Sequence, residues 1–412
     1  MERRVVVTGI GAVTPIGNNT NDFWDGLKNG KNGIGLITRF DTTDSKVKCA
    51  GEVKNFDPTT VVDKKEVKRT DLFSIYAMAA ADEAVKMSGI NLDTIDKHKF
   101  GVVIGSGIGG LCTIEEQATK LATKGMSRIA PLFIPMAISN MAAGNVAIRF
   151  GARGTCLDIV TACATATHSI GEAFRSIKHG YSDYILAGGS EASICKLGIG
   201  GFAALKALST SEDPSRASIP FDKERGGFVM GEGAGILFME SLESAQARGA
   251  EILAEVVGYG STCDAYHITS PLLDGDGAAK AMEAAMAEAG IEKTEVGYIN
   301  AHGTSTHIND ASETLAIKKA FGDYATEINI SSTKSMTGHL LGATGGVEAI
   351  ATILALKNGV VPPTINYQVP DEECDLNYTV NKAVERDVKY ALSNTLGFGG
   401  HNGVLCLKKW EE

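Results

Sequence analysis

Residues 155–168 read TCLDIVTACATATH, a stretch in which an apolar run passes directly into an alanine-rich one. Beyond Cys163, apolar residues recur three and four positions apart, which predicts a helix with one buried face: Ala166, Ile170, Ala173, Phe174 and Ile177. A thiol beside a helix N-terminus has a lowered pKa, and a sharp strand-to-helix turn exposes it for reaction. Buried cysteines are also common and mostly inert. The stretch therefore leaves two interpretations of Cys163 open, a nucleophile or a small core residue.

Composition limits the class of protein. The chain has 412 residues, of which 44% are hydrophobic and 21% charged, with a formal net charge of −10. That length can bury one large core or two ordinary ones. The acidic balance argues against nucleic acid as a partner. The N-terminal sequence MERRVVVTGIG predicts a first strand rather than a signal peptide.

Two further features concern membranes and redox chemistry. Residues 129–148 carry no charge, but they include Pro131 and Pro135, so they predict a loop plus a buried helix and no membrane span. The eight cysteines form no CxxC pair. We therefore expect reduced thiols in a cytoplasmic protein, with neither a disulfide framework nor a zinc site.

Short apolar runs that end in glycine and small polar residues alternate with helical patterns along the chain. The helical patterns cover residues 70–87, 164–179, 277–289, 310–321 and 345–357. The apolar runs are RRVVVTGIG, FGVVIGSGIGG, DYILAGGSEA, VGYINAHGTST and YALSNTLGFGGHNG. This alternation predicts an α/β protein whose sheet is covered on both faces.

The two halves of the chain repeat one another weakly. RRVVVTGIGAVTP resembles AEVVGYGSTCDAY in form, FGVVIGSGIGG resembles VGYINAHGTST, and DYILAGGSEA resembles YALSNTLGFGG. The repeat predicts duplication of one unit, with a first half over residues 1–249 and a second over residues 250–412.

The sequence GSGIGG at 105–110 matches a dinucleotide-binding pattern after an apparent strand. That fold needs an acidic residue about 20 positions further on. No Asp or Glu occurs between Glu116 and Asp158. A tight strand-to-helix turn beside a cavity is therefore the preferred interpretation.

A nucleophilic thiol needs catalytic companions, and two loops of the second half offer them. NAHGTST at 300–306 contains His302, and SSTKSMTGHLLGATGG at 331–346 contains Lys334 and His339. A lone histidine is usually structural, but loops at one edge of a sheet converge on a site. In the duplicated arrangement, Cys163 and the histidines would meet between the two halves.

Six ordered blocks carry a resemblance to a known family: VVVTGIGAVTPIG, DIVTACATATHSIG, PFDKERGGFVMGEGAG, NAHGTST, KSMTGHLLGATGGVEA and SNTLGFGGHNG. Along essentially its whole length the chain resembles the β-ketoacyl-[acyl-carrier-protein] synthases of the elongating type II class. The resemblance implies a thiolase-like fold with two similar halves in a layered αβαβα arrangement. It also implies a cytoplasmic homodimer that extends fatty acids on acyl carrier protein without a redox cofactor or catalytic metal.

Carried over residue by residue, the resemblance implies a set of catalytic roles. Cys163 matches the residue that accepts the acyl group. His302 and His339 match the pair that promotes decarboxylation of the malonyl group. Lys334 matches the lysine that orients this pair, and Glu313 matches its acidic partner.

The resemblance also implies substrate contacts. The backbone N–H groups of Phe398 and Cys163 would form an oxyanion hole, and the Phe398 ring would gate the acyl tunnel. The other matching positions are tunnel-lining Ile108 and Phe202, interface-crossing Phe133 and Ile134, and phosphopantetheine-binding Thr304 and Thr306.

Two more sites follow from the resemblance. Family members sometimes hold a structural monovalent cation near the counterparts of Asn300, Glu348, Ser393 and Asn394. The carrier protein is acidic as a class, so its docking needs a local basic patch on this acidic chain. The candidates are Lys64, Lys65, Lys68, Arg69 and Lys206, with Lys124 and Arg128 as weaker ones.

The chain departs from the family pattern at His307-Ile308, where proline often follows GTST, and at His401, where threonine is common. The sequence bears on three other interpretations. A non-catalytic chain-length factor would lack the nucleophile, and a thiolase would carry a second catalytic cysteine. A ketosynthase of a polyketide or specialised-lipid pathway uses the same chemistry and stays an alternative.

Overall fold

Strands from both halves of the chain join in one mixed sheet. The structure is a computed structural model and describes residues 2–411, within which a ten-stranded sheet has the order β10-β9-β13-β14-β8-β1-β7-β6-β4-β5. Its strands are β1 Val5–Val13, β4 Phe100–Gly105, β5 Cys156–Leu157, β6 Tyr184–Glu191, β7 Gly233–Ser241, β8 Ala254–Cys263, β9 Val296–Asn300, β10 Asn329–Ser331, β13 Tyr390–Gly397 and β14 His401–Lys409. Two small ribbons lie outside it, formed by β2 Gly35–Leu36 with β3 Cys49–Ala50, and by β11 Val360–Val361 with β12 Val384–Glu385.

Helices cover and separate the strands. They are α1 Thr20–Lys28, α2 Lys64–Val67, α3 Leu72–Ser88, α4 Leu111–Lys124, α5 Phe133–Ala137, α6 Met141–Phe150, α7 Thr165–Lys178, α8 Lys196–Ala204, α9 Leu242–Ala247, α10 Asp276–Ala289, α11 His307–Phe321, α12 Lys334–Thr337 and α13 Thr344–Asn358. Short 3₁₀ turns are η1 Pro58–Thr60, η2 Lys97–Lys99, η3 Met126–Arg128, η4 Ala162–Ala164, η5 Lys293–Glu295, η6 Gly322–Glu327 and η7 Leu341–Ala343.

The sheet repeats itself outward from its centre. β1 and β8 pair there antiparallel over three residue pairs, from Val5↔Val256 to Val7↔Ala254. On each side follow two antiparallel pairings and then two parallel ones. The three pairs of similar apolar runs fall on β1 and β8, β4 and β9, and β6 and β13, which hold matching places. The predicted division near residue 249 lies between α9 and β8, and both halves share the one sheet.

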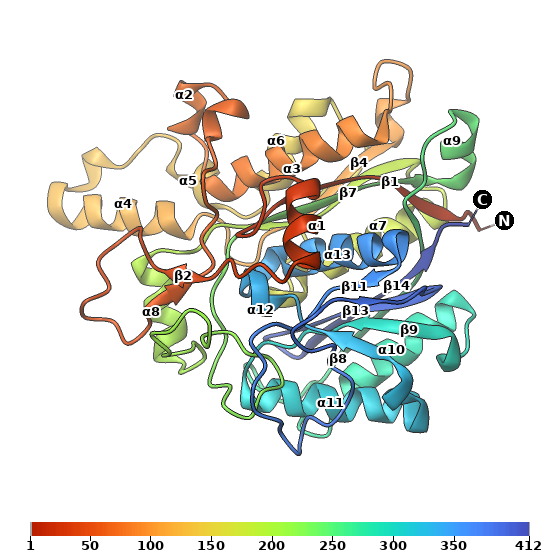
Figure 1. Ribbon diagram of the computed structural model, residues 1–412. Coiled ribbons are helices and arrows are strands. Elements are labelled where there is room, and N and C mark those ends of the chain that lie inside the picture. Colours follow the sequence, from red (N-terminus) through yellow and green to blue (C-terminus); the bar gives the residue numbers. More distant parts are fainter. Residues whose placement is uncertain (1, 412) are drawn as a thin grey trace.

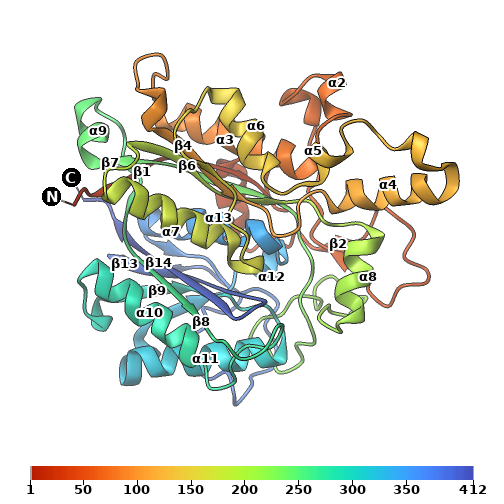
Figure 2. The same ribbon diagram turned by 180° about the vertical axis from the view of Figure 1, so that it is seen from behind.

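The layers follow the predicted αβαβα arrangement. Figures 1 and 2 show α7 and α13 between the strands of the two halves, with α3 and α6 outside one half and α10 and α11 outside the other. Every residue of α13 from Thr344 to Leu356 is buried, as its almost uniformly apolar sequence requires. A Cβ added at Gly345 would lie 2.1 Å from Thr167 Oγ1, so glycine lets the N-termini of α7 and α13 touch. That contact brings the two halves of the site together.

The region 129–148 differs from its prediction. It forms α5 and α6, but Ile134 is 60% and Ile148 77% exposed, so the expected buried helix is wrong for these side chains. Only one face of α6 packs inward, through Ala142, Ala143 and Val146. Within residues 2–411, no helix combines the length and apolarity that crossing a membrane requires.

Candidate active site

Cys163 lies in η4, at the tight turn that leads into α7. Ala162 has φ of +52°, a conformation that a residue with a Cβ adopts only at a cost, so this turn is a strained elbow. The strand before it is short, since β5 ends at Leu157. Cys163 is 9% exposed and lines a pocket of about 360 Å³. The position matches that of a nucleophile at the entry to a helix.

The electrostatics of the thiol differ from the prediction. Burial raises the pKa of Cys163 to about 12, although the charge of Lys334 and the backbone N–H of Phe398 both act to lower it. The expectation of a lowered pKa is therefore wrong, because desolvation of the thiolate outweighs the favourable helix N-terminus.

The sequence GFGG brings a backbone donor to the thiol. The N–H groups of Phe398 and of Cys163 itself both act on the sulfur. A Cβ at Gly397 would lie 2.7 Å from the Thr161 carbonyl oxygen, so glycine permits this close approach of β13 to the elbow. Two N–H groups aimed at one atom form an arrangement suited to a developing oxyanion.

His302 and His339 reach the same pocket from two loops of the second half. His302 follows β9, and His339 follows α12. Their ring centroids are 5.3 Å apart and the rings are nearly perpendicular, at 86°. The Leu341 N–H donates to His339 Nδ1 at 3.2 Å, so the proton of the neutral His339 ring lies on Nε2. His302 Nδ1 is buried without a protein partner.

Both imidazoles are held neutral. Burial lowers the pKa of each well below 6.5, and the charge of Lys334 lowers both further. A neutral imidazole carries one N–H, so the pair can supply one hydrogen-bond donor each without carrying charge.

Lys334 and the nearby carboxylates take different partners from those expected. Lys334 Nζ donates to Glu348 Oε1 at 2.5 Å, with both side chains 1% exposed. Glu313 instead accepts the backbone N–H groups of His302 and Gly303, each at 2.8 Å. Glu313 thus holds the loop that contains His302. Lys334, the first residue of α12, forms its ion pair with Glu348 of α13 instead.

Aromatic rings enclose one side of the pocket. Phe202 lies 6.2 Å from Phe398 and 5.5 Å from Phe228, and Phe228 stands edge-on to His339 at 5.1 Å. Ile108 packs in the apolar cluster that contains Phe202 and Phe228. Phe202, Phe228 and Phe398 therefore give this side of the pocket an apolar wall, whereas Ile108 is absent from the pocket lining.

The other expected substrate residues divide between two places. Thr304 and Thr306 line the pocket, with their Oγ1 atoms 2.9 Å apart, and His307 lies beside them. Phe133 and Ile134 lie on α5, away from the residues that line the pocket. His401 is also absent from the pocket lining and packs 6.3 Å from His168 instead.

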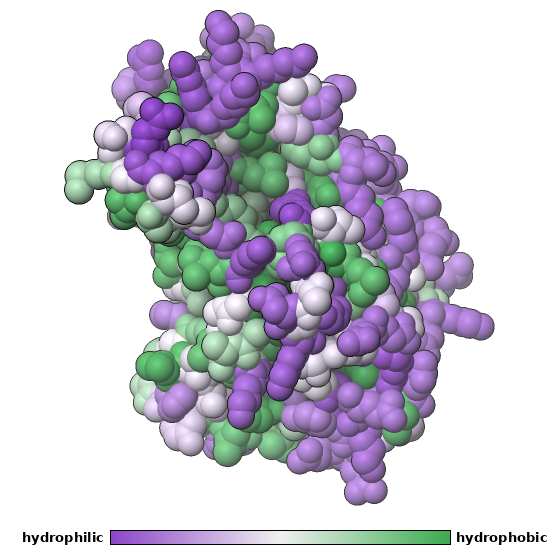
Figure 3. All heavy atoms as spheres, turned by 90° about the vertical axis from the view of Figure 1, so that its left-hand side faces the viewer, coloured by the Kyte–Doolittle hydropathy of each residue, from purple (hydrophilic) through white to green (hydrophobic). Residues whose placement is uncertain are grey.

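The basic candidates do not form one patch around the pocket of this chain. Lys206 is among the residues that line it. Lys64, Lys65, Lys68 and Arg69 are exposed on and after α2, and Lys68 borders a second cavity with Arg39 and Cys112. Figure 3 shows hydrophilic side chains along the upper edge of the molecule, above an apolar hollow. In Figure 1, α2 lies at the same height. Among residues 2–411, none of these four has an ion-pair partner.

The expected cation residues carry buried polar atoms without hydrogen-bond partners. Asn300 and Ser393 are partners on neighbouring strands β9 and β13. The buried atoms without a protein hydrogen-bond partner include Asn300 Oδ1 and Nδ2, Glu348 Oε2, Ser393 Oγ and Asn394 Oδ1. Oxygen atoms of this kind suit a hard cation.

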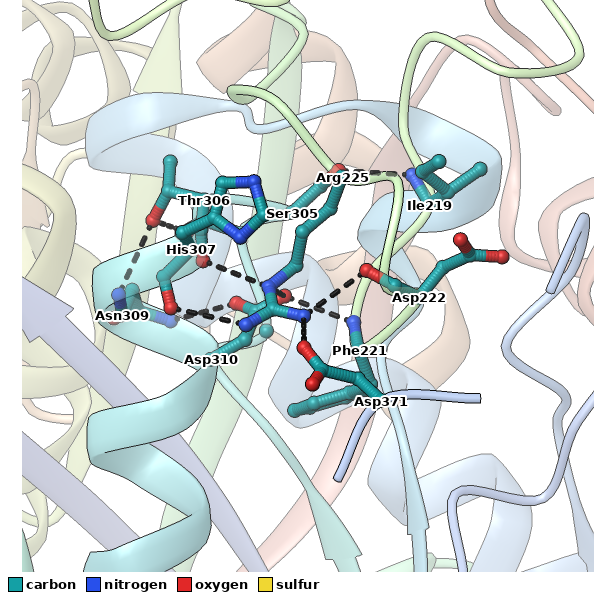
Figure 4. Close-up of polar contacts among 12 residues, drawn as sticks. Ile219, Phe221, Asp222, Arg225, Ser305, Thr306, His307, Asn309, Asp310 and Asp371 are labelled. Carbon is teal, nitrogen blue, oxygen red and sulfur yellow. Dashed lines mark hydrogen bonds and ion pairs between the residues drawn. The ribbon is translucent and has the colours of Figure 1, made fainter. Parts of the chain in front are cut away.

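Two of the buried charged residues that were not predicted from the sequence contact the loops of the site. Glu191 accepts hydrogen bonds from the backbone N–H groups of Gly107 at 2.8 Å and Gly342 at 3.1 Å, joining the turn before Ile108 to the loop after His339. Arg225 sits fully buried below the Thr304–His307 loop (Figure 4). A single arginine inside the glycine-rich block PFDKERGGFVMGEGAG was the available signal.

The fold and this Cys-His-His pocket define a condensing enzyme of the ketosynthase class. The model of the β-ketoacyl synthase N-terminal domain matches residues 2–245, and that of the C-terminal domain matches residues 253–368. The chain belongs to the β-ketoacyl synthase family, as its six blocks indicated.

Curated relatives and solved structures agree with this assignment. The chain is 53% identical over 411 residues to 3-oxoacyl-[acyl-carrier-protein] synthase 2 of Synechocystis, covering 100% of this chain and 99% of the relative. It is 54% identical over 409 residues to the protein of the same name from Staphylococcus aureus, covering 99% of each.

Three solved structures share the fold across at least 99% of this chain and 100% of their own. The ishigamide ketosynthase/chain length factor has a TM-score of 0.93 at 36% identity. A β-ketoacyl synthase from Burkholderia phymatum has a TM-score of 0.93 at 33% identity. A type II polyketide ketosynthase in complex with its acyl-carrier protein and bound to the hexaketide has a TM-score of 0.89 at 37% identity. The predicted thiolase-like fold is confirmed.

Proposed function

We propose that this chain catalyses the decarboxylative condensation of an acyl group with malonyl-acyl-carrier-protein, giving 3-oxoacyl-acyl-carrier-protein and CO2 in fatty acid elongation. The observation that carries the proposal is the convergence of Cys163, the Phe398 N–H and two neutral histidines in one pocket. The names of the relatives that share half of its sequence support it.

In the first half-reaction, the Cys163 sulfur attacks the carbonyl carbon of the carrier-bound acyl thioester. The negative charge on the carbonyl oxygen is stabilised by the backbone N–H groups of Phe398 and Cys163. The carrier thiol leaves with a proton, and the acyl group stays on Cys163 as a thioester. Lys334 favours the thiolate through its charge.

In the second half-reaction, the malonyl thioester loses CO2 and becomes an enolate. His302 and His339 donate their N–H groups to the thioester oxygen, where the negative charge develops. The enolate carbon then attacks the acyl carbonyl on Cys163, and the thiolate leaves. Neutral imidazoles suit this role because the low-dielectric pocket strengthens their hydrogen bonds and neither ring must first lose a proton.

Fatty acid elongation is favoured over the polyketide alternative by the degree of similarity. Identity reaches 53–54% with the curated 3-oxoacyl-acyl-carrier-protein synthases, against 36–37% with the ketosynthases whose names refer to polyketide or ishigamide assembly. The acyl chain length accepted is a matter of tunnel shape around Phe202 and Ile108.

We further propose a homodimer. β5 is an edge strand of the sheet, and its Leu157 is 51% exposed; Ile134 of α5 and Ile148 of α6 are also exposed, at 60% and 77%. A second copy covering this face would remove apolar surface from water and pair the exposed edge. Phe133 and Ile134 would then contact the partner's acyl tunnel.

A structural monovalent cation, held by Asn300, Glu348, Ser393 and Asn394, also belongs to the proposal. Bound there, it would satisfy the unpaired buried oxygens and brace β9 and β13, which carry His302 and the Phe398 loop.

Acyl carrier protein is the proposed partner, docking on Lys206 and the α2 residues. The cytoplasm is the proposed location, because free thiols persist in a reducing compartment.

In vitro elongation tests the function. Purified enzyme would receive acyl-carrier proteins of graded chain length with malonyl-carrier protein, and 3-oxoacyl products would be measured by mass spectrometry. We expect a two-carbon extension of saturated acyl groups and an acyl adduct on Cys163. Products extended repeatedly without reduction would instead point to polyketide synthesis, and absence of any adduct would overturn the assignment.

A further inference from the structure

Among residues 2–411, Arg225 is the largest fully buried side chain that carries a charge, and its hydrogen bonds reach the loop that contains Thr306 and His307. Its Nε donates to the Thr306 carbonyl at 3.3 Å, and its Nη2 donates to the His307 carbonyl at 3.1 Å (Figure 4). Its Nη1 donates to the Asp222 carbonyl at 3.0 Å and to Asp371. The guanidinium thus ties the segment 222–225 and Asp371 to the loop that carries Thr306 and His307.

That loop is strained where the threonines meet. Ser305 has φ of +72°, which a residue with a side chain adopts only when its surroundings enforce it. The Gly227 N–H donates to the Ser305 carbonyl at 2.9 Å, and the Ile219 N–H donates to Ser305 Oγ at 3.0 Å. With Ser305 held from these directions and the next two carbonyls held by Arg225, the loop has little freedom to relax.

The strained conformation at Ser305 places two threonine hydroxyls side by side. Thr304 and Thr306, on either side of Ser305, bring their Oγ1 atoms to 2.9 Å from each other at the wall of the active-site pocket. Two hydroxyls in contact can share a single amide group of a substrate that enters between them. His302 precedes this loop and is fixed separately by Glu313, so the hold of Arg225 falls on the threonines.

We propose that Arg225 is a positioning residue for the pantetheine arm of the substrate: it holds the Thr304–His307 loop in the strained form that presents both threonine hydroxyls. This inference rests on the proposed function, because it assumes a donor that carries such an arm. Arg225 does not line the pocket and acts only through the loop.

A matched control exists in Arg216. It donates from Nη1 to the Asn366 carbonyl at 2.6 Å, and it pairs with Asp222 at 3.2 Å and with Glu224 at 2.7 Å. None of its hydrogen bonds reaches residues 304–307. Replacing Arg216 therefore disturbs the surroundings of Arg225 without touching the threonine loop.

The test compares two acyl donors in the first half-reaction, with the Cys163 adduct measured by mass spectrometry. One donor is an acyl-pantetheine, and the other is the ethyl thioester of the same acid, which lacks the arm. In Arg225→Lys, a single ammonium replaces the planar fork and cannot reach both carbonyls. We expect kcat/KM for acyl-pantetheine to fall about tenfold or more, mainly through KM, because a misplaced loop costs binding of the arm. The ethyl thioester should react at a rate within about twofold of wild type.

Two further variants make the result decisive. Asp371→Asn removes an ion partner of Arg225 and should cause a smaller loss with the same donor preference, and Arg216→Lys should leave the preference unchanged. An equal loss with both donors in Arg225→Lys and Asp371→Asn would show that Arg225 serves the fold or Cys163 and overturn the inference. Should wild type itself fail to prefer acyl-pantetheine over the ethyl thioester, the loop would not bind the arm and the inference would be overturned as well. Failure of the proposed function would appear differently, as absence of a Cys163 adduct with either donor.

Discussion

The ring planes of His302 and His339 stand at 86° to each other, with centroids 5.3 Å apart. They come from different loops, yet both are buried and neutral, and both line the pocket of Cys163. Perpendicular rings at this distance can direct two N–H groups to one oxygen from two sides. The geometry therefore serves a charge that develops on a substrate atom between them.

Replacing either histidine should separate the two half-reactions. We expect His302→Ala or His339→Ala to lower malonyl decarboxylation by about 10²–10³, the typical loss of one oxyanion donor. Acylation of Cys163 should change far less, because its donors are backbone N–H groups. Release of labelled CO2 and formation of the Cys163 adduct measure the two steps separately. An equal loss in both would mean that the histidines activate the thiol or support the fold.

The thiol gives a prediction about pH. Burial raises the pKa of Cys163 to about 12, so the thiolate is a minor form at neutral pH and its fraction rises with pH. Below that pKa, the fraction increases about tenfold for each pH unit. Alkylation of Cys163 by iodoacetamide should therefore keep accelerating from pH 7 to pH 10, whereas a free cysteine levels off above about pH 8.5.

Peptide mass spectrometry would follow Cys163 alone among the eight cysteines. A plateau of the alkylation rate near pH 7 would contradict the prediction and would mean that Lys334 and the helix N-terminus outweigh burial. Lys334→Met removes a charge that lowers the pKa, so it should slow alkylation further at every pH in that range.

The layered sheet and the meeting of Cys163, His302 and His339 in one pocket could be predicted from the sequence for identifiable physical reasons. Apolar runs closed by glycine mark buried strands, and the duplicated pattern placed Cys163 opposite the two histidines. Partner choice could not be predicted in the same way. The ion pair of Lys334 with Glu348 rather than Glu313 depends on how α12 and α13 pack, which no spacing reveals. The pKa of Cys163 depends on burial by segments that are distant in the sequence. Ile148 is exposed because no other part of the single chain covers its surface.

The unpaired buried oxygens of the expected cation site give a prediction about ions. At constant ionic strength, we expect the melting temperature to be higher in potassium or sodium chloride than in N-methyl-D-glucamine chloride, by an amount on the order of a few degrees. The melting temperature should rise because the cation would bind the folded state alone, where it would pair with the buried polar atoms of Asn300, Ser393 and Asn394.

Ser393→Ala removes one oxygen from the set and should reduce that difference, while the melting temperature in N-methyl-D-glucamine chloride should change little. A control variant, Ser215→Ala, removes an exposed hydroxyl far from these strands and should keep the full difference. Identical melting temperatures of the wild-type protein in all three salts would contradict a bound cation.

The last prediction concerns docking of the carrier protein. The chain carries a net charge of −10, so attraction of an acidic partner requires a local positive surface. Lys65 and Arg69 are exposed near α2 and have no ion partner among residues 2–411, so their charges are free to act on a partner. Reversing both charges to glutamate should raise KM for acyl-carrier protein and weaken its dependence on salt, because steering is screened beyond about 8 Å at physiological ionic strength.

The same double reversal should leave turnover of acyl-pantetheine nearly unchanged, since that donor carries no acidic protein. Lys293 and Lys382 provide the matched control: both are exposed, and reversing them alters the net charge by the same amount elsewhere on the surface. If the control variant raised KM for the carrier substrate equally, the total charge and not the α2 residues would govern the encounter. If acyl-pantetheine and the carrier substrate lost activity together, the effect would lie in the fold. Only a loss confined to the carrier substrate and to Lys65 and Arg69 identifies these residues as the docking surface.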